Sequence, residues 1–198
     1  MKKKLILASQ SPRRKSLITE LGLKFKTDPA RNFQEKFETK NSSPAQIVVH
    51  NAEGKALEIA QKHKNAYILG VDTIGSYKGE ILSKPKNTKD AKRILRFINN
   101  TTHEVISGIC IISTDKKGKI VKKISDFERT YVTFDRMTEK EIDAYINSGE
   151  SMDKAAAFAI QGLGSLFIKK IDGDYFNVVG LPIFKMKKMF EELGEKLV

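Results

Sequence analysis

The feature that most constrains the fold is a pair of long strand-like stretches in the middle of the chain. Residues 103–113 and 119–134 are rich in β-branched side chains, and a turn over residues 115–118 separates them. The other predicted strands and helices do not alternate strictly, as they would in a doubly wound parallel sheet. We therefore expect an α/β fold in which helices flank a mixed β-sheet.

Two serine–proline pairs mark the starts of helices, because serine caps a helix and proline fits its first turn. Ser11-Pro12 predicts a helix over residues 12–22, and Ser43-Pro44 predicts one over residues 44–62. The remaining segments are predicted as strands over 4–8, 67–74 and 81–82, helices over 89–98, 139–148 and 183–193, a loop over 28–42, and a hairpin of strands over 166–171 and 175–179. Residues 153–161 fit either a helix or a loop.

Length and cysteine content exclude several classes of protein. The 198 residues fit one domain, spanning residues 1–198. The single cysteine, Cys110, cannot form an internal disulfide or a cysteine-based zinc site, which excludes a disulfide-stapled secreted module. The apolar stretch around it is too short to span a bilayer, and the apolar start of the chain stops at Ser9, too early for a signal peptide. We expect a soluble cytoplasmic protein without a membrane partner.

The chain is strongly basic, with 36 Lys and Arg against 24 Asp and Glu and a formal net charge of +12. Such an excess suits polyanions such as phosphates or nucleic acid. The lysines are scattered, however, so a solvated lysine-rich surface explains most of the charge. Arginine is more informative because its planar fork suits bidentate phosphate contacts, and Arg13 and Arg14 are adjacent.

The turn between the first strand and the first helix combines these arginines with hydroxyl groups. The free N–H groups and partial positive charge of a helix N-terminus favour an anion, and two guanidinium groups there are unfavourable without one. Ser9 and Ser11 add hydroxyl donors. The turn is therefore either a phosphate site or a plain helix cap with two solvated arginines.

Asp72 interrupts a strand that otherwise has the composition of a buried one. A buried carboxylate is costly unless it is paired, protonated or metal-bound, and such residues serve as general bases and metal ligands. The alternative is that Asp72 caps the following turn. Lys55 presents a similar choice, because helical spacing places it on an apolar face. Its ammonium either reaches solvent along that face or is directed at a phosphate.

Several standard sites are absent from the sequence. Neither the P-loop nor the Rossmann dinucleotide motif occurs, nor does G-x-S-x-G. The paired aromatic motifs of RNA-recognition domains are also missing. The histidines lack metal-ligand spacing: His63 is predicted at the surface, and His50 and His103 as ordinary polar residues.

Short motifs extend over nearly the whole chain in a fixed order. They are Leu7 to Arg14, Ala52 with Lys55-Ala56, Gly70 to Thr73, Gly79 to Leu82 with Lys84-Pro85, His103 to Val105 with Ser107-Gly108, Tyr145 with Ser148 to Glu150 and Asp153 to Ala155, Ala159 to Gly162, and Asn177 to Pro182. Each motif is weak alone, but the ordered set is specific. With this set the chain resembles the Maf-like nucleotide pyrophosphatases.

The resemblance implies an α/β fold like that of inosine triphosphate pyrophosphatases, with two lobes around a cleft. It implies hydrolysis of a nucleoside triphosphate to the monophosphate and pyrophosphate, helped by a divalent cation (Mg²⁺, Mn²⁺ or Co²⁺), in a cytoplasmic homodimer. The implied proton acceptor is Asp72. The implied phosphate-binding residues are Ser9, Arg13, Arg14, Lys55 and Lys84. Glu35 matches an acidic loop position, so the implied metal ligands are Glu35 and Asp72.

The resemblance also implies which base is selected. The family subgroup that hydrolyses dTTP and UTP has arginine, threonine and glutamine at three positions, and this chain has Arg13, Thr73 and Gln161 there. The subgroup that prefers 7-methyl-GTP tends to carry tryptophan, glutamine and glutamate. A glutamine amide offers both a donor and an acceptor, which match the N3–H and a carbonyl of uracil or thymine.

The chain departs from the family pattern at two positions. Gln34 stands where an acidic residue is common, so metal coordination in that loop is expected to use fewer carboxylates. Ala156 stands where glycine is usual. Because alanine is strained at positive φ, we expect a helical or extended backbone there.

The alternative function is a non-enzymatic nucleotide or nucleic-acid binding protein linked to septum formation. It is suggested by the charge of +12 and by the association of the family with septation. Asp72 discriminates between the two functions, because a carboxylate among basic residues adds nothing to polyanion binding. A small nucleoside triphosphate is therefore the expected partner, in preference to nucleic acid.

Overall fold

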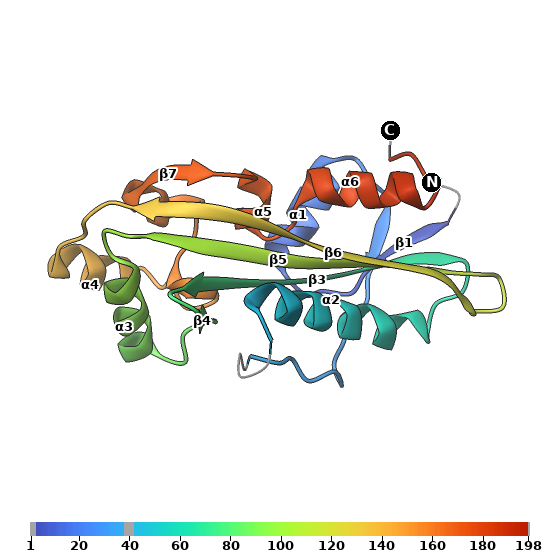
Figure 1. Ribbon diagram of the computed structural model, residues 1–198, viewed down its shortest axis with the longest axis horizontal. Helices are drawn as coiled ribbons and strands as arrows, with labels where there is room; N and C mark the ends of the chain where they lie inside the picture. The colour runs from blue at the N-terminus through green and yellow to red at the C-terminus, as the bar shows by residue number, and fades with distance from the viewer. Residues whose placement is uncertain (1–2, 38–41, 198) are drawn as a thin grey trace.

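The computed structural model describes residues 3–37 and 42–197 (Figure 1). In this part of the chain, seven strands form one sheet with the order β2-β1-β3-β5-β6-β7, and β4 pairs with β3. The strands are β1 (Lys4–Leu7), β2 (Phe25–Thr27), β3 (Ala66–Tyr77), β4 (Glu80–Leu82), β5 (Thr102–Thr114), β6 (Ile120–Phe134) and β7 (Ile168–Asp172). Residues 28–37 follow β2 as the predicted loop, whose residues 38–41 lie outside the described part.

The sheet is mixed, as the sequence predicts. β1 pairs in parallel with β2 and β3, whereas the pairs β3–β5, β5–β6 and β6–β7 are antiparallel. The two long strands predicted around the turn at 115–118 are β5 and β6, which extend along most of the length of the molecule (Figure 1). β2 has no counterpart among the predicted strands.

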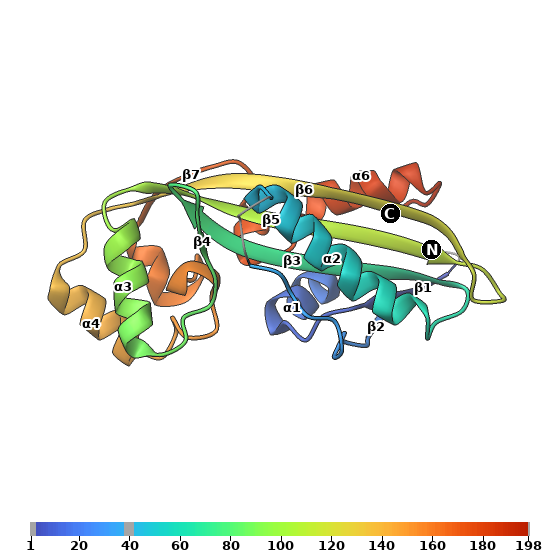
Figure 2. The same cartoon turned by 60° about the horizontal axis from the view of Figure 1, so that its bottom comes forward.

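Helices cover both faces of the sheet at the end that carries β1 (Figures 1 and 2). The helices are α1 (Pro12–Glu20), α2 (Pro44–Ala60), α3 (Thr88–Ile98), α4 (Glu139–Asn147), α5 (Tyr175–Val179) and α6 (Ile183–Glu192), with 3₁₀ turns at Ala155–Ala157 and Gly162–Phe167. Successive strand residues face opposite sides. Leu5 and Leu69 therefore pack with α1 and α6, while Ile6 and Ile68 pack with α2.

A second hydrophobic cluster lies at the other end of β5 and β6, where α3 and α4 pack (Figure 2). Leu95 of α3, Ile142 of α4 and Phe158 are buried in it. The molecule therefore has two lobes that share the long strands. No helix within residues 3–37 and 42–197 has both the length and the apolar character needed to cross a membrane.

Two glycines allow α2 to approach the sheet closely. A Cβ on Gly70 would lie 2.2 Å from the carbonyl oxygen of Ala52, and one on Gly108 would lie 2.2 Å from the backbone of Val48. A side chain at either position would push α2 away from the sheet, from β3 at Gly70 and from β5 at Gly108. This close packing matters for function, because α2 and β3 both carry candidate site residues.

The predicted hairpin over residues 166–179 is wrong in its second strand. β7 pairs with β6, but the following segment forms the short helix α5. The side chain of Asp174 accepts a hydrogen bond of 2.7 Å from the N–H of Phe176 and caps this helix. Buried Asn177 donates to the Val105 carbonyl and to the Thr130 hydroxyl, and β-propensity does not include such tertiary contacts.

The backbone at Ala156 is neither helical nor extended, contrary to expectation. Its φ is +54° and that of Ala157 is +57°. A left-handed conformation costs an alanine roughly 1–2 kcal/mol. The methyl group of Ala156 is buried, and it fills the space beside Gly75, where an added Cβ would lie 2.6 Å away. Packing within the second lobe therefore offsets the strain.

His103 is not the ordinary polar residue that the sequence predicts. Its side chain is 1% exposed, stacks on Phe134 and meets Phe158 edge-on. Neither ring nitrogen has a hydrogen-bond partner among the described residues. Burial lowers the pKa of His103 from 6.5 to about 4, so the imidazole is a neutral part of the core at neutral pH.

Candidate active site

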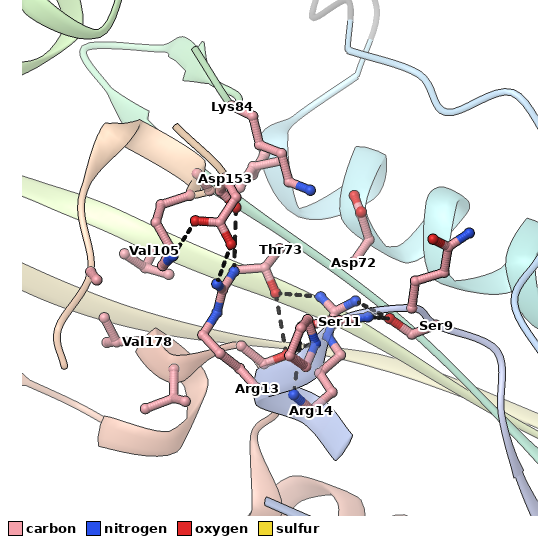
Figure 3. A pocket seen from close by; sticks show the side chains of 18 of the residues that line it. Ser9, Ser11, Arg13, Arg14, Asp72, Thr73, Lys84, Val105, Asp153 and Val178 are labelled. Atoms are coloured by element: carbon pink, nitrogen blue, oxygen red, sulfur yellow. Dashed lines mark hydrogen bonds and ion pairs between the residues drawn. The ribbon is translucent and has the colours of Figure 1, made fainter. Parts of the chain in front are cut away.

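A cavity of about 1080 Å³ lies between the two lobes (Figure 3). Every site residue singled out in the sequence contributes to its wall: Ser9, Arg13, Arg14, Glu35, Lys55, Asp72, Thr73, Lys84 and Gln161. They come from separate elements, namely the β1–α1 turn, the first turn of α1, the loop before α2, α2 itself, β3, the loop after β4 and the segment between the two 3₁₀ turns. The fold thus brings these residues together, and their roles in binding and catalysis stay predictions.

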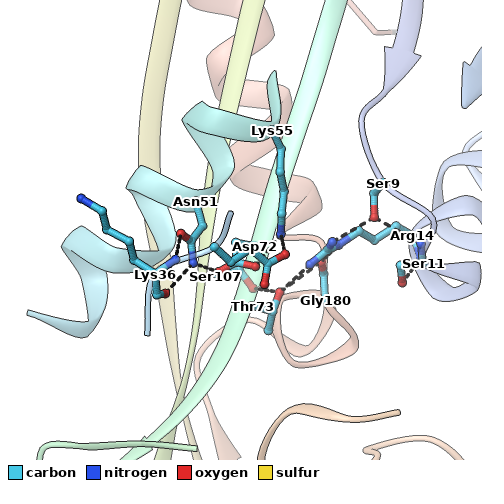
Figure 4. A network of polar contacts seen from close by, with 11 residues as sticks. Ser9, Ser11, Arg14, Lys36, Asn51, Lys55, Asp72, Thr73, Ser107 and Gly180 are labelled. Carbon is cyan, nitrogen blue, oxygen red and sulfur yellow. Dashed lines mark hydrogen bonds and ion pairs between the residues drawn. The ribbon is translucent and has the colours of Figure 1, made fainter. Parts of the chain in front are cut away.

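Arg14 lies in the first turn of α1 and is held by neutral oxygen atoms alone (Figure 4). Its Nε donates to the Gly180 carbonyl at 2.8 Å, Nη1 to the Ser9 hydroxyl at 3.0 Å and Nη2 to the Thr73 hydroxyl at 3.0 Å. Burial lowers the pKa of Arg14 to about 10, although the Asp72 carboxylate opposes this shift. No carboxylate of the described residues forms an ion pair with it, so its charge remains available to an anion in the cavity.

The predicted cap of α1 is also present. Ser11 is the N-cap, and its hydroxyl accepts a hydrogen bond from the N–H of Arg14 at 3.5 Å. The Ser11 N–H in turn donates to the Ser9 hydroxyl at 3.2 Å. The cap is therefore present, but the two arginines are not simply solvated, because Arg14 bonds to Ser9 and Thr73 and Arg13 pairs with Asp153. Anion binding at this turn stays a prediction.

Asp72 is buried on β3, where two side chains of α2 hold its carboxylate (Figure 4). Lys55 Nζ lies 2.7 Å from Oδ1, and Asn51 Nδ2 donates to Oδ2 at 2.9 Å. Lys55 Nζ also lies 2.6 Å from Oε1 of Glu35. Lys55 therefore directs its ammonium into the cavity and does not extend to solvent, and Asp72 does not serve as a turn cap.

The pair of Glu35 and Asp72 fits the requirements of a divalent cation that is shared with substrate. Mg²⁺ is commonly held by one or two carboxylates together with substrate phosphates and waters. Both carboxylates contact the Lys55 ammonium, so both face one position that favours a cation. No group of three or more His, Cys, Asp or Glu residues suited to a metal occurs in residues 3–37 and 42–197. Gln34 is exposed and adds no carboxylate to this pair.

Arg13 spans the cavity from α1 to the loop after α4 (Figure 3). Its Nη1 lies 3.1 Å from Oδ2 of Asp153, whose other carboxylate oxygen contacts Lys154. The Asp153 side chain is 60% exposed, so this ion pair contributes little to stability. Asp153 and Lys154 had no predicted role in the sequence beyond their place in the motif set, yet both line the cavity.

Glu150 holds the segment that carries Gln161. Its carboxylate accepts hydrogen bonds from the N–H of Leu163 and of Gly164, both at 2.9 Å, and from the Tyr145 hydroxyl at 3.0 Å. Burial disfavours the charged form of Glu150, but these donors stabilise it, and the pKa of the carboxyl lies below its usual value.

At Gly162, next to Gln161, there is no room for a larger residue because the Glu150 carboxylate lies too close. Gly162 has a φ of +80°, and a Cβ there would lie 2.3 Å from the Glu150 carboxylate. The side chain of Gln161 itself is exposed, lines the cavity and has no hydrogen-bond partner among the described residues. Its amide donor and acceptor are therefore available to a ligand.

With the site geometry established, the chain can be compared with known proteins. A sequence model of the Maf-like proteins matches residues 4–193. The chain belongs to the Maf-like family. Among curated relatives, a dTTP/UTP pyrophosphatase from Dictyoglomus thermophilum is 41% identical over the whole of both chains, and one from Bacillus pumilus is 43% identical over 96% of each.

Solved structures give a more distant similarity. A HAM1 protein from Coxiella burnetii is 15% identical and aligns over 68% of this chain and 74% of its own, with a TM-score of 0.45.

The family membership confirms the resemblance read from the ordered motifs. In this Maf-like protein, those motifs meet at one cavity although they are spread from Ser9 to Gly180.

Two residues of the Maf-like protein that hold parts of the site had no role predicted from the sequence, although Glu150 belongs to the motif set. Asn51 is four residues before Lys55, so helical spacing alone indicates that both lie on the same face of α2. Glu150 has no comparable local pattern, because its partners are backbone N–H groups 13 and 14 residues away. Such a role is visible only after the chain has folded.

Proposed function

We propose that this Maf-like protein hydrolyses nucleoside triphosphates, dTTP and UTP foremost, to the nucleoside monophosphate and pyrophosphate. The observation that carries the proposal is a partly buried Arg14 that has no carboxylate partner within residues 3–37 and 42–197, in the same cavity as the carboxylate of Asp72. The names of the relatives from Dictyoglomus thermophilum and Bacillus pumilus support the same activity and the same substrates.

The basic side chains of the cavity bind the triphosphate. Arg14 already donates a hydrogen bond to Ser9, and Lys84 reaches the cavity from the opposite lobe. Charge-assisted contacts of this kind contribute about 1.5–3 kcal/mol each. Arg13 is paired with Asp153, and Lys55 is paired with Glu35 and Asp72. Both basic side chains also bind the triphosphate when its oxygens compete with these carboxylates.

Asp72 acts on the water that attacks the α-phosphorus. It either accepts a proton from that water or helps to hold a cation that acidifies it. The water oxygen forms a bond to the α-phosphorus, the bond from this phosphorus to the bridging oxygen breaks, and pyrophosphate leaves. The partial burial of the cavity strengthens each of these charge interactions relative to bulk water.

A divalent cation is part of the proposal, with Mg²⁺, Mn²⁺ and Co²⁺ as the candidates and Glu35 and Asp72 as its protein ligands. A cation held there would supply positive charge to the triphosphate and would lower the pKa of a water bound to it. The convergence of both carboxylates on the Lys55 ammonium supports this assignment.

Base selection is assigned to the exposed amide of Gln161, supported by Arg13 and Thr73. The free donor and acceptor of Gln161 match the N3–H and a carbonyl of uracil or thymine. Thr73 contributes through Arg14, whose guanidinium donates to its hydroxyl. A missing hydrogen-bond partner typically costs about 1–3 kcal/mol, which is enough to rank substrates.

The same proposal includes one Maf-like domain over residues 1–198, a homodimeric assembly and a cytoplasmic location. The continuous sheet shared by both lobes supports the single domain. The assembly and the location are what the family resemblance implies. Light scattering coupled to gel filtration measures the assembly directly, and a monomer at micromolar concentration contradicts it.

A substrate panel tests the proposed activity. The protein is incubated with dTTP, UTP, CTP, ATP, GTP or 7-methyl-GTP and each divalent cation, and phosphate is measured with malachite green with and without added inorganic pyrophosphatase. We expect phosphate to be released faster with dTTP and UTP than with the other nucleotides, and only when pyrophosphatase is present. Signal without pyrophosphatase contradicts cleavage between the α- and β-phosphates.

The panel also separates the proposal from its alternative. Faster hydrolysis of GTP or 7-methyl-GTP overturns the base assignment and leaves the pyrophosphatase activity standing. If no triphosphate is consumed with any cation, the non-enzymatic binding function is favoured instead. The ion pairs of Asp72 and Glu35 with Lys55 oppose that alternative, because they remove positive charge from the cavity.

A further inference from the structure

We propose that Asn51 is a positioning residue that locks the Asp72 carboxylate and the Glu35–Lys36 segment into one rigid unit. The inference rests on the proposed function, in which Asp72 acts on the attacking water. Asn51 does not line the cavity and therefore acts on the reaction only through the residues it holds.

The side chain of Asn51 is fully buried and bridges two segments that are far apart in the sequence (Figure 4). Its Nδ2 donates to Oδ2 of Asp72 at 2.9 Å and to the carbonyl of Lys36 at 3.0 Å. Its Oδ1 accepts a hydrogen bond from the N–H of Lys36 at 2.8 Å. Both amide hydrogens and the amide oxygen are thus engaged, which leaves one orientation for the side chain.

Asn51 and Lys55 form two parallel bridges, one helical turn apart. Asn51 joins Asp72 to the backbone of Lys36, and Lys55 joins Asp72 to the side chain of Glu35. Each α2 side chain takes a different carboxylate oxygen of Asp72. When phosphate draws the Lys55 ammonium away, Asn51 still holds Oδ2, so Oδ1 keeps its direction toward the cavity.

Removal of the Asn51 amide has two predictable consequences. The Oδ2 atom of Asp72 and the N–H and carbonyl of Lys36 lose buried partners, and such groups either recruit water or rotate away. Misplacement of a reacting group by about 1 Å costs on the order of 100-fold in rate. Asn51 bonds only to Lys36 and Asp72 among the described residues, so the side chains of Ser9, Arg14 and Lys84, to which the proposed function assigns phosphate binding, are expected to keep their positions.

Steady-state kinetics of Asn51→Ala test the proposal, with dTTP and UTP as substrates. We expect kcat to fall roughly 10- to 100-fold while KM changes by less than about threefold, because a reacting group is displaced and substrate binding is retained. An unchanged kcat in a folded variant overturns the proposal. Asn51→Leu fills the vacated volume and provides the same measurement if the alanine variant is unstable.

A double-mutant cycle distinguishes positioning from a general structural role. If Asn51 acts through the carboxylate of Asp72, then adding Asn51→Ala to Asp72→Asn lowers kcat by less than about threefold further. A structural role gives losses that multiply in the double variant, and that outcome contradicts the proposal.

The matched control is Asn99, which forms the same two-bond contact with the backbone of Met137 in the other lobe. Its Nδ2 donates to the Met137 carbonyl at 2.9 Å, and its Oδ1 accepts from the Met137 N–H at 2.7 Å. Asn99→Ala removes an equivalent pair of bonds away from the cavity. We expect kcat to remain at the wild-type value in this variant.

Amide hydrogen exchange provides a readout that does not depend on activity. The Lys36 N–H is expected to exchange at least about tenfold faster in Asn51→Ala than in the wild type, and to be unaffected by Asn99→Ala. Unchanged exchange at Lys36 overturns the docking of the segment. If the wild-type protein hydrolyses no triphosphate, the proposed function fails, while the exchange measurement still decides whether Asn51 holds the segment.

Discussion

Lys55 shows how a single side chain in this site serves two partners. Its ammonium lies 2.7 Å from Asp72 and 2.6 Å from Glu35, so in the free protein it neutralises part of the charge of both carboxylates. A triphosphate offers more negative charge to the same ammonium. The residues of the site are therefore poised between internal pairing and substrate binding, which single substitutions can test.

Asp72→Asn removes the acid–base and ligand properties of the carboxylate and keeps its shape. The Asn51 amide can still donate to the remaining oxygen, so the fold is expected to persist. We expect kcat with dTTP to fall roughly 10²–10⁴-fold. Circular dichroism and thermal unfolding serve as the control for folding. Turnover close to the wild-type value would assign Asp72 a structural role only.

Gln161→Glu replaces an amide with a group that only accepts hydrogen bonds at neutral pH. The N3–H of thymine or uracil keeps its acceptor, but the base carbonyl loses its donor. We expect kcat/KM for dTTP and UTP to fall by about 5- to 150-fold, which corresponds to about 1–3 kcal/mol. The kcat/KM for GTP in the same variant is the internal control. An equal loss for every nucleotide contradicts a role in base selection.

At the scale of elements, the second lobe places Gln161 through contacts that span many residues. Glu150, just beyond α4, accepts hydrogen bonds from Leu163 and Gly164, and Tyr145 of α4 accepts one from Ala159 at 3.0 Å. Both ends of the segment from Ala159 to Gly164 are thus tied to α4 and the turn after it. The position of the base-selecting amide is a property of this lobe and not of its local sequence.

The packing of the 3₁₀ turn at Ala155–Ala157 against β3 gives a prediction at this scale. Gly75→Ala would place a Cβ 2.6 Å from the Ala156 methyl group and 3.3 Å from Leu82. We expect a loss of about 1–3 kcal/mol in the free energy of unfolding, as in other overpacked cores. Urea unfolding measures this loss.

The compensating change is Ala156→Gly, which removes the closer contact and relieves the left-handed strain. In the Gly75→Ala background, this second change is expected to recover part of the lost free energy of unfolding. Losses that add in the double variant would show that the two positions do not interact.

At the scale of the whole molecule, the long strands that the two lobes share carry buried polar side chains. His103 lies in β5 within the second hydrophobic cluster, with Phe134 and Phe158 against its ring. Phe158 also lines the cavity, so the core around this histidine forms part of the site wall. Its charge state therefore affects the stability of the folded protein, because the folded state buries the ring.

The pH dependence of stability follows from the direction of the His103 shift. Its pKa is 6.5 in the unfolded chain and about 4 in the folded protein. Between these values the unfolded state binds more protons, so the free energy of unfolding falls as pH decreases from 6.5 toward 4. The full shift corresponds to about 3 kcal/mol. The free energy of unfolding is measured with urea at about pH 7.0, 5.5 and 4.5, from above the window to near its lower end.

The matched variants for this measurement are His103→Phe and His50→Ala. The phenylalanine ring keeps an aromatic group beside Phe134 and cannot be protonated, so the loss of stability in this window is expected to shrink. His50 is exposed, and its replacement should leave the loss unchanged. A wild-type stability that is constant from pH 7 to 4.5 contradicts the assignment.

Local patterns in the sequence determined most of the elements. The serine–proline caps, the β-branched stretches and the capping box of Thr138 and Glu141 predicted α1, α2, β5, β6 and α4 close to their observed bounds. These features depend on hydrogen bonds and side-chain periods within a few residues, which are the same in the isolated segment and in the folded chain. The ordered motifs likewise identified the family and most of the residues that line the cavity.

Only the tertiary structure decided the features that depend on distant partners. Residues 175–179 have β-propensity but form a helix, because Asn177 bonds to β5 and β6. Ala156 adopts positive φ because its methyl group packs against Gly75 of β3, and His103 is neutral because the second lobe buries it. Asn51 and Glu150 gain their roles from partners 15, 21, 13 and 14 residues away. The contacts that stabilise these features form only in the folded chain, because they join residues that are distant in sequence, so no local pattern encodes them.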